Sequence, residues 1–305
     1  MGPQILIGDV RTKLSEINTQ SVQTCITSPP YWGLRDYGND GQIGLEQSPE
    51  EYVAELVAVF REVRRVLTDD GTIWLNLGDS YSSPPKGNLN GQDKSGLTST
   101  STQINSPAGF DKSNFGLPSK NLIGIPWRVA FALQADGWYL RQDIIWAKPN
   151  PMPESVTDRC TKSHEYMFLL SKSQKYFYDN EAIKEPTTTR DSTNRDRDST
   201  RLNNTPGRAK MKGLKTNDYE LRNKRDVWTI STRPYRGAHF AVMPEALVEP
   251  CVLAGSKPGD LVLDPFMGSG TVGVVALNHG RRFMGVELNP EYVKLAYERI
   301  GQRLL

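Results

Sequence analysis

Short runs rich in apolar residues alternate with helical patterns along most of this chain of 305 residues. The apolar runs, interpreted as strands, cover residues 5–7, 22–26, 72–77, 139–146, 166–170, 261–263 and 283–286. The helical patterns cover residues 48–67, 125–133 and 244–254, and two more begin at residues 271 and 290. A strand that is apolar on both faces needs cover on both sides, and helices between such strands supply it. The alternation therefore predicts a three-layer α/β fold with a mostly parallel sheet, whose ligands bind beyond the carboxyl ends of the strands.

The helix that follows residue 48 carries the clearest start signal. Ser48 fits the N-cap position, Pro49 fits the first helical position, and Glu51 completes a capping box. Apolar residues then recur at helical spacing as far as Leu67. We expect Gly71 to end this element and a buried strand to follow it.

Two polar segments interrupt the alternation and keep the hydrophobic fraction at 37%. Residues 82–120 are rich in Ser, Gly and Asn and lack a periodic apolar pattern, which is typical of a functional or disordered loop. Residues 184–226 hold 12 Lys or Arg against 7 Asp or Glu, although the net charge of the whole chain is only +2. Such a basic segment fits a phosphate-contacting arm or a solvated loop, and charge alone favours the loop.

A tight glycine-rich turn follows the apolar run 261–263 and precedes a helix. The turn reads DPFMGSGT from residue 264 to residue 271, and Glu287 ends the next strand. Glycines in such a turn allow positive φ angles and the close approach of a ligand, or they simply allow close packing of a helix on a strand. An acidic residue at the end of the next strand is placed to accept hydrogen bonds from ribose hydroxyls.

The same turn formally satisfies the dinucleotide motif GxGxxG through Gly268, Gly270 and Gly273. An NAD-dependent oxidoreductase therefore has to be considered. However, Asp264 lies at the strand tip directly before the glycines, where a carboxylate would repel a pyrophosphate and attract a cationic amino-acid group. This favours an adenosine ligand without phosphates.

The strand at 22–26 ends in the sequence TSPPYW. Two prolines fix two φ angles and cannot continue a sheet ladder, so the carbonyls of Ser28 and Pro29 lose their usual partners. Tyr31 and Trp32 then offer an aromatic face. Acceptor carbonyls, a hydroxyl and a stacking ring suit the exocyclic amino group of a planar base. The alternative is an edge-strand Pro-Pro followed by core aromatics.

Together, TSPPYW, DPFMGSGT and GVELN resemble the amino-methyltransferases of DNA, which methylate exocyclic nitrogens using S-adenosyl-L-methionine. The resemblance covers nearly the whole chain outside the polar segments and includes ILIGD, GWYLRQDIIWAKPNPMPE, KSHEYMFLLSKS, RDVWTI and HFAVMPEALVEPCV. The SPPY element precedes the glycine element, which is similar to the circularly permuted β-type members. The resemblance implies a Rossmann-like methyltransferase fold made of residues 1–183 and 236–305, with an inserted target-recognition segment at 184–235.

The resemblance assigns the proline turn to catalysis. It implies that Ser28 and the Pro29 carbonyl accept hydrogen bonds from the target amino group and that Tyr31 stacks on the flipped base. The nitrogen would shift from planar toward tetrahedral, which frees its lone pair to attack the methyl group. Neither a metal nor a nucleophilic cysteine is required. The predicted catalytic residues are Ser28, Pro29, Pro30 and Tyr31.

The resemblance places S-adenosyl-L-methionine on the glycine turn, with Glu287 on the ribose and Leu288 and Asn289 flanking the adenine. Asp9 matches an acidic position near that adenine, although a turn residue at a strand end is the alternative. His239 matches the segment that closes over the methionine part, and a structural histidine is an equal alternative. The predicted cofactor-binding residues are Asp9, His239, Phe240, Asp264, Pro265, Phe266, Gly268, Ser269, Gly270, Thr271, Glu287, Leu288 and Asn289.

Double-stranded DNA is the implied partner. The basic segment lies where the family usually recognises its target, which promotes it from a solvated loop to an expected DNA contact. The predicted DNA-binding residues are Arg195, Arg197, Arg201, Arg208, Lys210, Lys212 and Lys215. Residues 82–120 are interpreted as a loop that orders on DNA. A homodimer and a cognate restriction endonuclease, both of which occur in this family, stay open, as do the roles of Lys148, His164 and Glu165 at recurrent family positions.

The target amino group within this family is either N4 of cytosine or N6 of adenine. Serine at the first position of SPPY is commoner among the cytosine enzymes, whereas aspartate dominates among the adenine enzymes. Both residues can bond an amino group. Ser28 therefore favours cytosine N4, with adenine N6 as the alternative.

Other functions fit these motifs less well. Carbon-5 cytosine methylation requires a nucleophilic cysteine, and Pro250-Cys251 lies within an apolar helical pattern. Protein glutamine methyltransferases carry NPPY after the glycine motif, which is the reverse of the order here. A DNA-binding relic without activity would show decayed motifs, whereas both motifs are intact. An NAD-dependent oxidoreductase would use neither SPPY nor the basic segment.

Metal, disulfide and membrane roles have little support. Cys25, Cys160 and Cys251 form no CxxC pair, and the three histidines lack metal-ligand spacing, so we expect no metal site. No apolar run approaches the roughly 20 residues of a membrane span, and the N-terminus lacks the pattern of a signal peptide. The sequence thus predicts a soluble, cytoplasmic protein without membrane contact.

Overall fold

The computed structural model describes residues 2–83, 110–112, 115–187, 221–232 and 242–301. The chain divides into two compact units, one formed by Met1–Asp179 with Asp226–Leu305 and the other by Asn180–Arg225. Each unit is described by itself below. The predicted cofactor residues His239 and Phe240 lie outside the described residues, as do all the predicted DNA-binding residues.

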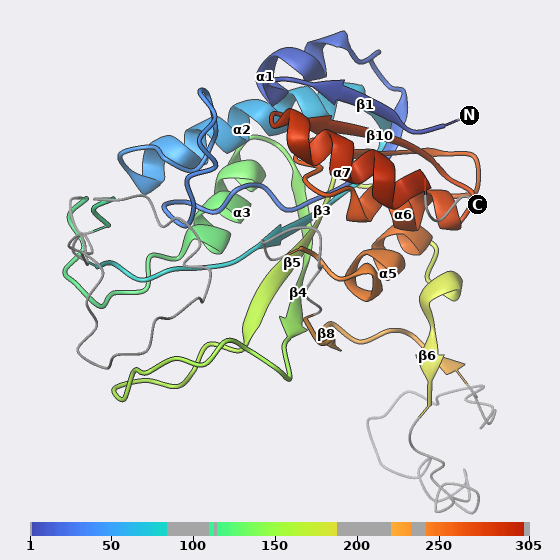
Figure 1. Cartoon of the computed structure of the whole chain (residues 1–305). Helices are drawn as coiled ribbons and strands as arrows, with labels where there is room; N and C mark the ends of the chain where they lie inside the picture. The colour runs from blue at the N-terminus through green and yellow to red at the C-terminus, as the bar shows by residue number, and fades with distance from the viewer. Residues whose placement is uncertain (1, 84–109, 113–114, 188–220, 233–241, 302–305) are drawn as a thin grey trace, which may run out of the picture. The chain divides into compact units, whose positions relative to one another are not determined.

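The larger unit is built on one sheet with the strand order β1-β10-β9-β2-β3-β5-β4-β8 (Figure 1). Its strands are β1 Gln4–Ile7, β2 Val22–Thr27, β3 Leu67–Leu77, β4 Tyr139–Ala147, β5 His164–Ser171, β8 Val227–Thr229, β9 Leu261–Asp264 and β10 Arg282–Glu287. Strand β5 runs antiparallel to both of its neighbours, and every other adjacent pair in this sheet is parallel. The predicted mostly parallel sheet is confirmed.

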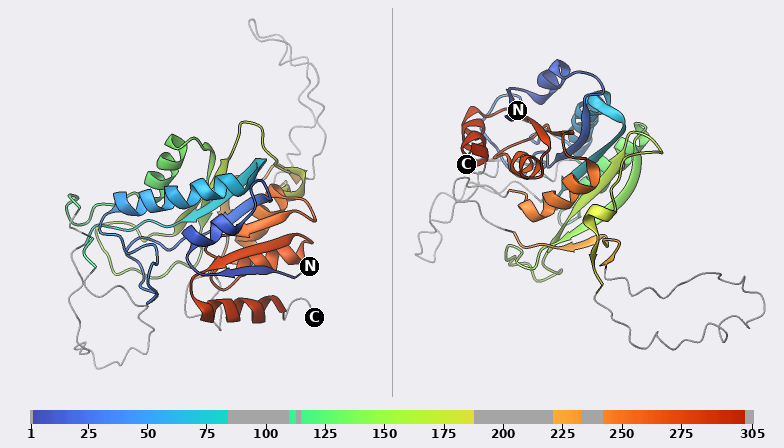
Figure 2. Two further views of the ribbon diagram at one scale, coloured as in Figure 1. Left: turned by 90° about the horizontal axis from the view of Figure 1, so that it is seen from above. Right: turned by 90° about the vertical axis from the view of Figure 1, so that its right-hand side faces the viewer.

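Helices cover both faces of this sheet (Figure 2). On one face lie α1 Val10–Lys13, the 3-10 turn Leu14–Glu16, α2 Pro49–Val66 and α3 Ile125–Ala135. On the other lie α5 Glu245–Gly255, α6 Thr271–Asn278 and α7 Pro290–Gly301. Helix α2 packs on α3 and α5 packs on α6, so each group forms a continuous layer. This is the predicted three-layer α/β architecture.

Helix α2 shows why its sequence folds as a buried amphipathic helix. Its residues Tyr52, Leu56 and Phe60 lie on one face and are fully buried. Burying each such side chain contributes about 1.5–3 kcal/mol. At its start the Ser48 hydroxyl accepts a hydrogen bond from the Glu51 amide at 3.2 Å, so the predicted N-cap is confirmed. The Glu51 carboxylate bonds the amide of Gln47 rather than that of Ser48, so the predicted capping box is displaced by one residue.

The end of α2 differs from the prediction. The helix ends at Val66 and β3 begins at once at Leu67, five residues before the strand that we expected. Pairing of Leu67 with Val22 of β2 favours the extended conformation here. Gly71 lies inside β3, where a Cβ atom would come within 3.1 Å of the Gln23 carbonyl oxygen. Its role is therefore close backbone approach and not helix termination.

The smaller unit contains a short antiparallel pair. Strand β6, Glu185–Pro186, pairs with β7, Leu221–Arg222, after the 3-10 turn Glu181–Ile183. The Glu185 carboxylate accepts hydrogen bonds from Arg222 at 2.9 Å and from Arg225 at 2.8 Å. These contacts join the two ends of the basic segment. Its role in target recognition stays a prediction.

Among the described helices, none combines the length and the apolar character that a membrane span requires.

Candidate active site

The two predicted turns lie side by side at one edge of the sheet. Strands β2 and β9 are parallel neighbours, with Cys25 opposite Leu263, so their carboxyl ends meet at the same edge. Thr27 ends β2 and Asp264 ends β9. The Thr27 hydroxyl donates to Oδ1 of Asp264 at 2.6 Å, and both side chains are buried. The proline turn and the glycine turn are therefore joined at this edge of the sheet.

The glycine turn uses its glycines for backbone geometry and for packing. Gly268 and Gly270 have φ angles of 53° and 77°, in the left-handed region that only glycine adopts readily. A Cβ atom at Gly270 would also lie 3.0 Å from the Cβ atom of Ala296 in α7. At Gly273 a Cβ atom would lie 2.7 Å from the Phe283 ring. The expected positive φ angles are confirmed at Gly268 and Gly270 and close packing is confirmed at Gly270 and Gly273, whereas the close approach of a ligand stays a prediction.

The hydrogen bonds of the buried Asp264 carboxylate stabilise its negative charge only in part. It is 1% exposed and accepts hydrogen bonds from the Thr27 hydroxyl and from the Phe266 amide at 3.1 Å. Burial raises the pKa of Asp264 to about 7, although these two hydrogen bonds favour the charged form. A cationic ligand group would provide the missing stabilisation of the charge.

Glu287 lies at the end of β10, the neighbour of β9. Its Oε2 accepts a hydrogen bond from the Gly268 amide and its Oε1 accepts one from the Asn289 amide, both at 2.8 Å. Burial raises the pKa of Glu287, and these backbone hydrogen bonds lower it in part. A carboxylate has about four acceptor sites, so Glu287 retains capacity for the hydroxyl groups of a ligand. Together Asp264 and Glu287 form an acidic cradle that fits a ligand with hydroxyls and a cationic end and disfavours a pyrophosphate.

The other predicted cofactor residues mostly frame this cradle. Arg299 of α7 donates to the Ser269 hydroxyl at 3.1 Å and to the Thr271 hydroxyl at 2.8 Å, which ties the turn to α7. Asn289 accepts a hydrogen bond from the Glu291 amide at 2.9 Å at the start of α7. Pro265 is buried, and Phe266 and Leu288 are partly buried. These residues hold the acids in position.

Asp9 follows β1, which pairs with β10, so it lies at the same edge of the sheet. Its carboxylate accepts a hydrogen bond from the Arg11 amide at 2.8 Å and caps α1. It is also paired with the Arg11 guanidinium, which holds the pKa of Asp9 below its usual value. This geometry matches the turn-residue alternative, and contact with an adenine stays a prediction.

The proline turn leaves two carbonyl groups unused. The Pro30 carbonyl accepts a hydrogen bond from the Tyr52 hydroxyl at 2.8 Å, and the Tyr31 carbonyl accepts one from the Leu34 amide at 3.2 Å. In the part of the chain that the structure describes, the carbonyls of Ser28 and Pro29 accept no hydrogen bond. The prediction that these two carbonyls remain available is confirmed.

The two aromatic residues of the turn have different environments. Trp32 is 1% exposed, donates to the Glu46 carbonyl at 2.9 Å and packs edge-on against Phe110 and Phe115. The expectation that Trp32 offers a face to a ligand is therefore wrong, because the core covers it. Tyr31 is only partly buried, and its hydroxyl lies 2.8 Å from Oε2 of Glu165. Burial and this carboxylate hold the pKa of Tyr31 well above its usual range, so its phenol stays protonated.

Asn76 was not singled out from the sequence, and Lys148 and Glu165 were named there without a role, although all three support the proline turn. Asn76 of β3 lies 3.1 Å from the Tyr31 hydroxyl, and its amide donates to Glu165 at 3.2 Å. Lys148, directly after β4, forms an ion pair with Glu165 of β5. All three are polar residues at strand ends on the edge where the two turns lie, and that position was the available signal. Thr27 was missed in the same way.

Cys251 shows that the Pro-Cys pair is structural. It is fully buried within α5, and its thiol donates to the Leu247 carbonyl at 3.3 Å. Burial in a helix that covers the sheet denies it the access that a nucleophile needs.

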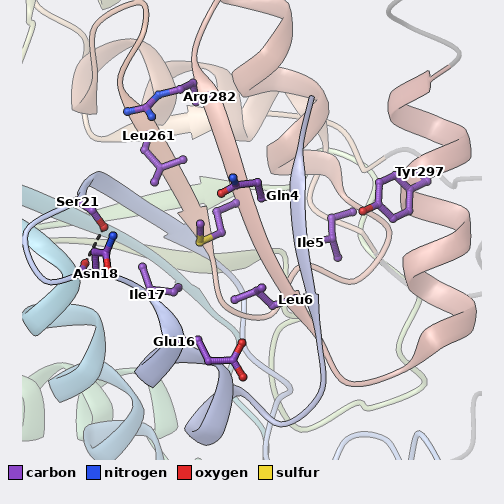
Figure 3. A pocket seen from close by; sticks show the side chains of 11 residues that line it. Gln4, Ile5, Leu6, Glu16, Ile17, Asn18, Ser21, Leu261, Arg282 and Tyr297 are labelled. Carbon is purple, nitrogen blue, oxygen red and sulfur yellow. Dashed lines mark hydrogen bonds between the residues drawn. The ribbon is translucent and has the colours of Figure 1, made fainter. Parts of the chain in front are cut away.

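A hollow of about 870 Å³ lies at the opposite edge of the sheet (Figure 3). Gln4, Leu261 and Arg282 line it, and each is the first residue of its strand. None of the predicted site residues lines this hollow. Its size alone gives no reason to prefer this hollow as the candidate active site, because the polar groups described above converge at the carboxyl ends of the strands.

The sequence of this chain is similar to those of known DNA methyltransferases. A family model described as DNA methylase, of the N6/N4 methyltransferase type, matches residues 22–298. The type II methyltransferase M.SmaI of Serratia marcescens is 50% identical over 300 residues, which cover 98% of this chain and 91% of the relative. M.Cfr9I of Citrobacter freundii is 48% identical over 299 residues, which cover 98% of this chain and 88% of the relative.

Solved structures share the fold. PvuII DNA methyltransferase, described as cytosine-N4-specific, superposes with a TM-score of 0.64 at 21% identity, covering 99% of this chain and 91% of the other. A DNA modification methylase of Thermus thermophilus, solved in complex with S-adenosyl-L-methionine, gives a TM-score of 0.60 at 24% identity, covering 99% and 96%. With the family match and the two long relatives, the paired turns at one sheet edge lead to one conclusion: the chain belongs to the N6/N4 family of DNA methyltransferases.

Proposed function

We propose that this enzyme transfers a methyl group from S-adenosyl-L-methionine to the exocyclic N4 amino group of a cytosine that is flipped out of duplex DNA. The observation that carries the proposal is the Thr27–Asp264 hydrogen bond of 2.6 Å. It joins a turn with two unused carbonyls to a turn that carries the buried Asp264 carboxylate, beside the partly buried Glu287 at the end of β10. One turn suits an amino group and the other suits a cationic adenosine ligand, at adjacent strand ends.

The glycine turn holds the cofactor. Glu287 accepts hydrogen bonds from the ribose hydroxyls, and Asp264 faces the cationic amino-acid part. When bound, S-adenosyl-L-methionine supplies an activated methyl group. Asp264 becomes fully ionised when its cationic partner is present, since a nearby opposite charge lowers the pKa of a buried carboxyl.

The proline turn holds the target base. The Ser28 hydroxyl and the Pro29 carbonyl accept the two N–H groups of the amino group. Both protons are then occupied, and the nitrogen lone pair is turned away from conjugation with the ring. As the new N–C bond forms, the bond from the methyl group to sulfur breaks and the amino nitrogen releases one proton to solvent. The main contribution of these residues is orientation and electrostatic stabilisation, because no covalent enzyme intermediate is needed.

Tyr31 compensates for removing the base from the duplex. Flipping costs a few kcal/mol, and stacking of a base on an aromatic ring returns about 1–3 kcal/mol. The neutral phenol keeps the ring next to Glu165 without adding a second negative charge. The basic segment 184–226 supplies phosphate contacts in this proposal, and its contribution should decrease as salt increases.

Ser28 is the reason for choosing cytosine over adenine, because the first residue of the proline turn differs between the two groups of the family. Nucleoside mass spectrometry of DNA methylated by the purified enzyme tests the choice directly. We expect N4-methylcytosine. Detection of N6-methyladenine alone would overturn the cytosine assignment and leave the amino-methyltransferase assignment intact.

A further inference from the structure

The hydroxyl group of Tyr31 is held by side chains of β5 and β3, and the Ser28 hydroxyl of its own turn lies 3.4 Å from it. Oε2 of Glu165 lies 2.8 Å from it and Oδ1 of Asn76 lies 3.1 Å from it. A phenol has one proton to donate, and a carboxylate is a stronger acceptor than an amide. The Asn76 amide group also donates to Oε2 of Glu165 at 3.2 Å and to the Tyr166 carbonyl at 3.1 Å. The Tyr31 hydroxyl therefore donates to Glu165, and Asn76 orients the same carboxylate oxygen.

The second oxygen of Glu165 is fixed as well. Oε1 pairs with the Lys148 ammonium group, and the side chains of Lys148 and Glu165 are 16% and 17% exposed. The ammonium group also lies 4.2 Å from the centroid of the Trp146 ring. Trp146 of β4 is opposite Glu165 of β5 in the antiparallel ladder, so the sheet itself sets the position of the pair.

The ring of Tyr31 is restricted on its side too. A Cβ atom at Gly78 would lie 2.6 Å from Cε2 of Tyr31, so the ring packs directly against the backbone at the end of β3. With the hydroxyl anchored at its tip and Gly78 at its edge, the ring has little freedom to rotate. Such a contact surface loses little conformational entropy when a ligand binds.

We propose that Glu165, held by Lys148, is a positioning residue that fixes the Tyr31 ring in the orientation required to stack on the target base. The inference rests on the proposed function, because it takes Tyr31 as the stacking residue. Glu165 itself does not contact the base. Its effect on methyl transfer passes through the Tyr31 hydroxyl, and a purely structural role in joining β4 to β5 would not depend on that hydroxyl.

A double-mutant cycle separates these two roles. Single-turnover methyl transfer to duplex DNA is measured for the native enzyme, Glu165→Gln, Tyr31→Phe and the double variant, with cofactor and DNA saturating. We expect Glu165→Gln to lower the rate about tenfold in the native background and less than about twofold in the Tyr31→Phe background. The dissociation constant for S-adenosyl-L-methionine should stay within about twofold in all four proteins, because none of these residues belongs to the glycine turn.

Asp136→Asn is the matched control. Asp136 is 14% exposed, pairs with Arg61 at 2.6 Å and caps α3 at the opposite edge of the sheet. The rate of methyl transfer by Asp136→Asn should be close to that of the native enzyme, and adding this change to Tyr31→Phe should alter the rate equally little. Lys148→Gln provides a second variant, which should repeat the dependence of Glu165→Gln on the Tyr31 hydroxyl. Thermal unfolding of each variant reports loss of fold separately from loss of rate.

The inference would be overturned if Glu165→Gln lowered the rate of methyl transfer by the same factor in the native and Tyr31→Phe backgrounds. A native rate for Glu165→Gln alone would also overturn it. Either result leaves the proposed function standing, because the native enzyme still methylates DNA. If the native enzyme transfers no methyl group to DNA, the proposed function itself fails and the cycle cannot be measured.

Discussion

The glycine turn and the proline turn are adjacent, yet they are stabilised in different ways. Apart from the hydrogen bond between Thr27 and Asp264, the glycine turn is held by contacts within 30 residues along the chain, such as Gly268 with Glu287 and Phe266 with Asp264. The proline turn takes its support from far along the chain, through Asn76 and Glu165. Most of the proposed cofactor half therefore comes from one stretch of the chain, whereas the proposed base half depends on strands that are far apart in the sequence.

This difference has a functional consequence. In the proposed site, most of the glycine turn is assembled once β9, β10 and α6 are formed, and Thr27 of β2 completes it. The base half requires β2, β3, β4 and β5 to be in register before Tyr31 is fixed. We therefore expect substitutions in one half to affect cofactor affinity and substitutions in the other half to affect methyl transfer, with little exchange between the two.

Replacing Tyr31 with alanine should have the largest effect. Loss of stacking worth about 1–3 kcal/mol lowers methyl transfer up to about 100-fold, since each 1.4 kcal/mol is a factor of ten. Cofactor affinity should remain native, because Tyr31 lies in the base half. Tritiated methyl transfer and calorimetric titration measure the two quantities. Native turnover in Tyr31→Ala would contradict the stacking role.

Glu287→Gln should weaken cofactor binding and leave the rate of methyl transfer nearly unchanged, which is the opposite of the result expected for Tyr31→Ala. A glutamine cannot accept from both the Gly268 and the Asn289 amides, so one donor loses its partner. The expected result is a dissociation constant for S-adenosyl-L-methionine raised about 10- to 30-fold, with a near-native rate at saturating cofactor. Glu291→Gln, an exposed neighbour in α7, is the control and should bind normally. An unchanged dissociation constant in Glu287→Gln would remove Glu287 from the cofactor site.

Asp264→Asn tests the electrostatics of the glycine turn through pH. The carboxyl of Asp264 has a pKa of about 7 when folded, well above its ordinary value of 3.8, so the folded state binds more protons between these values. The free energy of unfolding of the native protein should therefore fall as pH rises from about 4 to about 7. We expect Asp264→Asn to be more stable than the native protein at pH 8, by about 2–3 kcal/mol, and the difference to shrink toward pH 4.

Urea unfolding without cofactor measures this difference. The Asn side chain still accepts the hydrogen bonds from Thr27 and Phe266, so the change removes mainly the charge. The same variant should bind S-adenosyl-L-methionine more weakly, which separates stability from function. A stability difference that is constant from pH 5 to pH 8 would show that Asp264 does not titrate in this range.

Gly270→Ala should have the smallest effect of the four substitutions, and the effect should be on the stability of the fold and on cofactor binding. A non-glycine residue in the left-handed region costs about 1–2 kcal/mol, and the new methyl group also meets Ala296. Gly259→Ala is a matched control, because Gly259 has a φ of 89° and nothing lies within 4 Å of its Cβ position. Only Gly270→Ala should also weaken cofactor binding. Equal effects of the two variants on binding would mean that the glycine turn is not specific to the cofactor.

The same contrast explains what the sequence could predict. The glycine turn was predictable because its partners are close in sequence, as with Asp264 and Phe266, and because positive φ angles demand glycine. The contact of Tyr31 with Glu165 was not predictable, because Glu165 lies 134 residues away and meets Tyr31 only after β5 pairs with β3. The early end of α2 at Val66 was missed for a related reason, because strand pairing of Leu67 with Val22 outweighed the helical pattern.

In the proposed function, the two turns form a single methyl-transfer site at the carboxyl ends of β2 and β9. A crystal structure of the enzyme with S-adenosyl-L-homocysteine and a duplex carrying its target tests it most directly. We predict ribose hydroxyls on Glu287, the amino group of a flipped base on Ser28 and the Pro29 carbonyl, and the Tyr31 ring stacked on that base. A nucleoside bound instead in the hollow lined by Gln4 and Arg282, with an empty glycine turn, would contradict the claim.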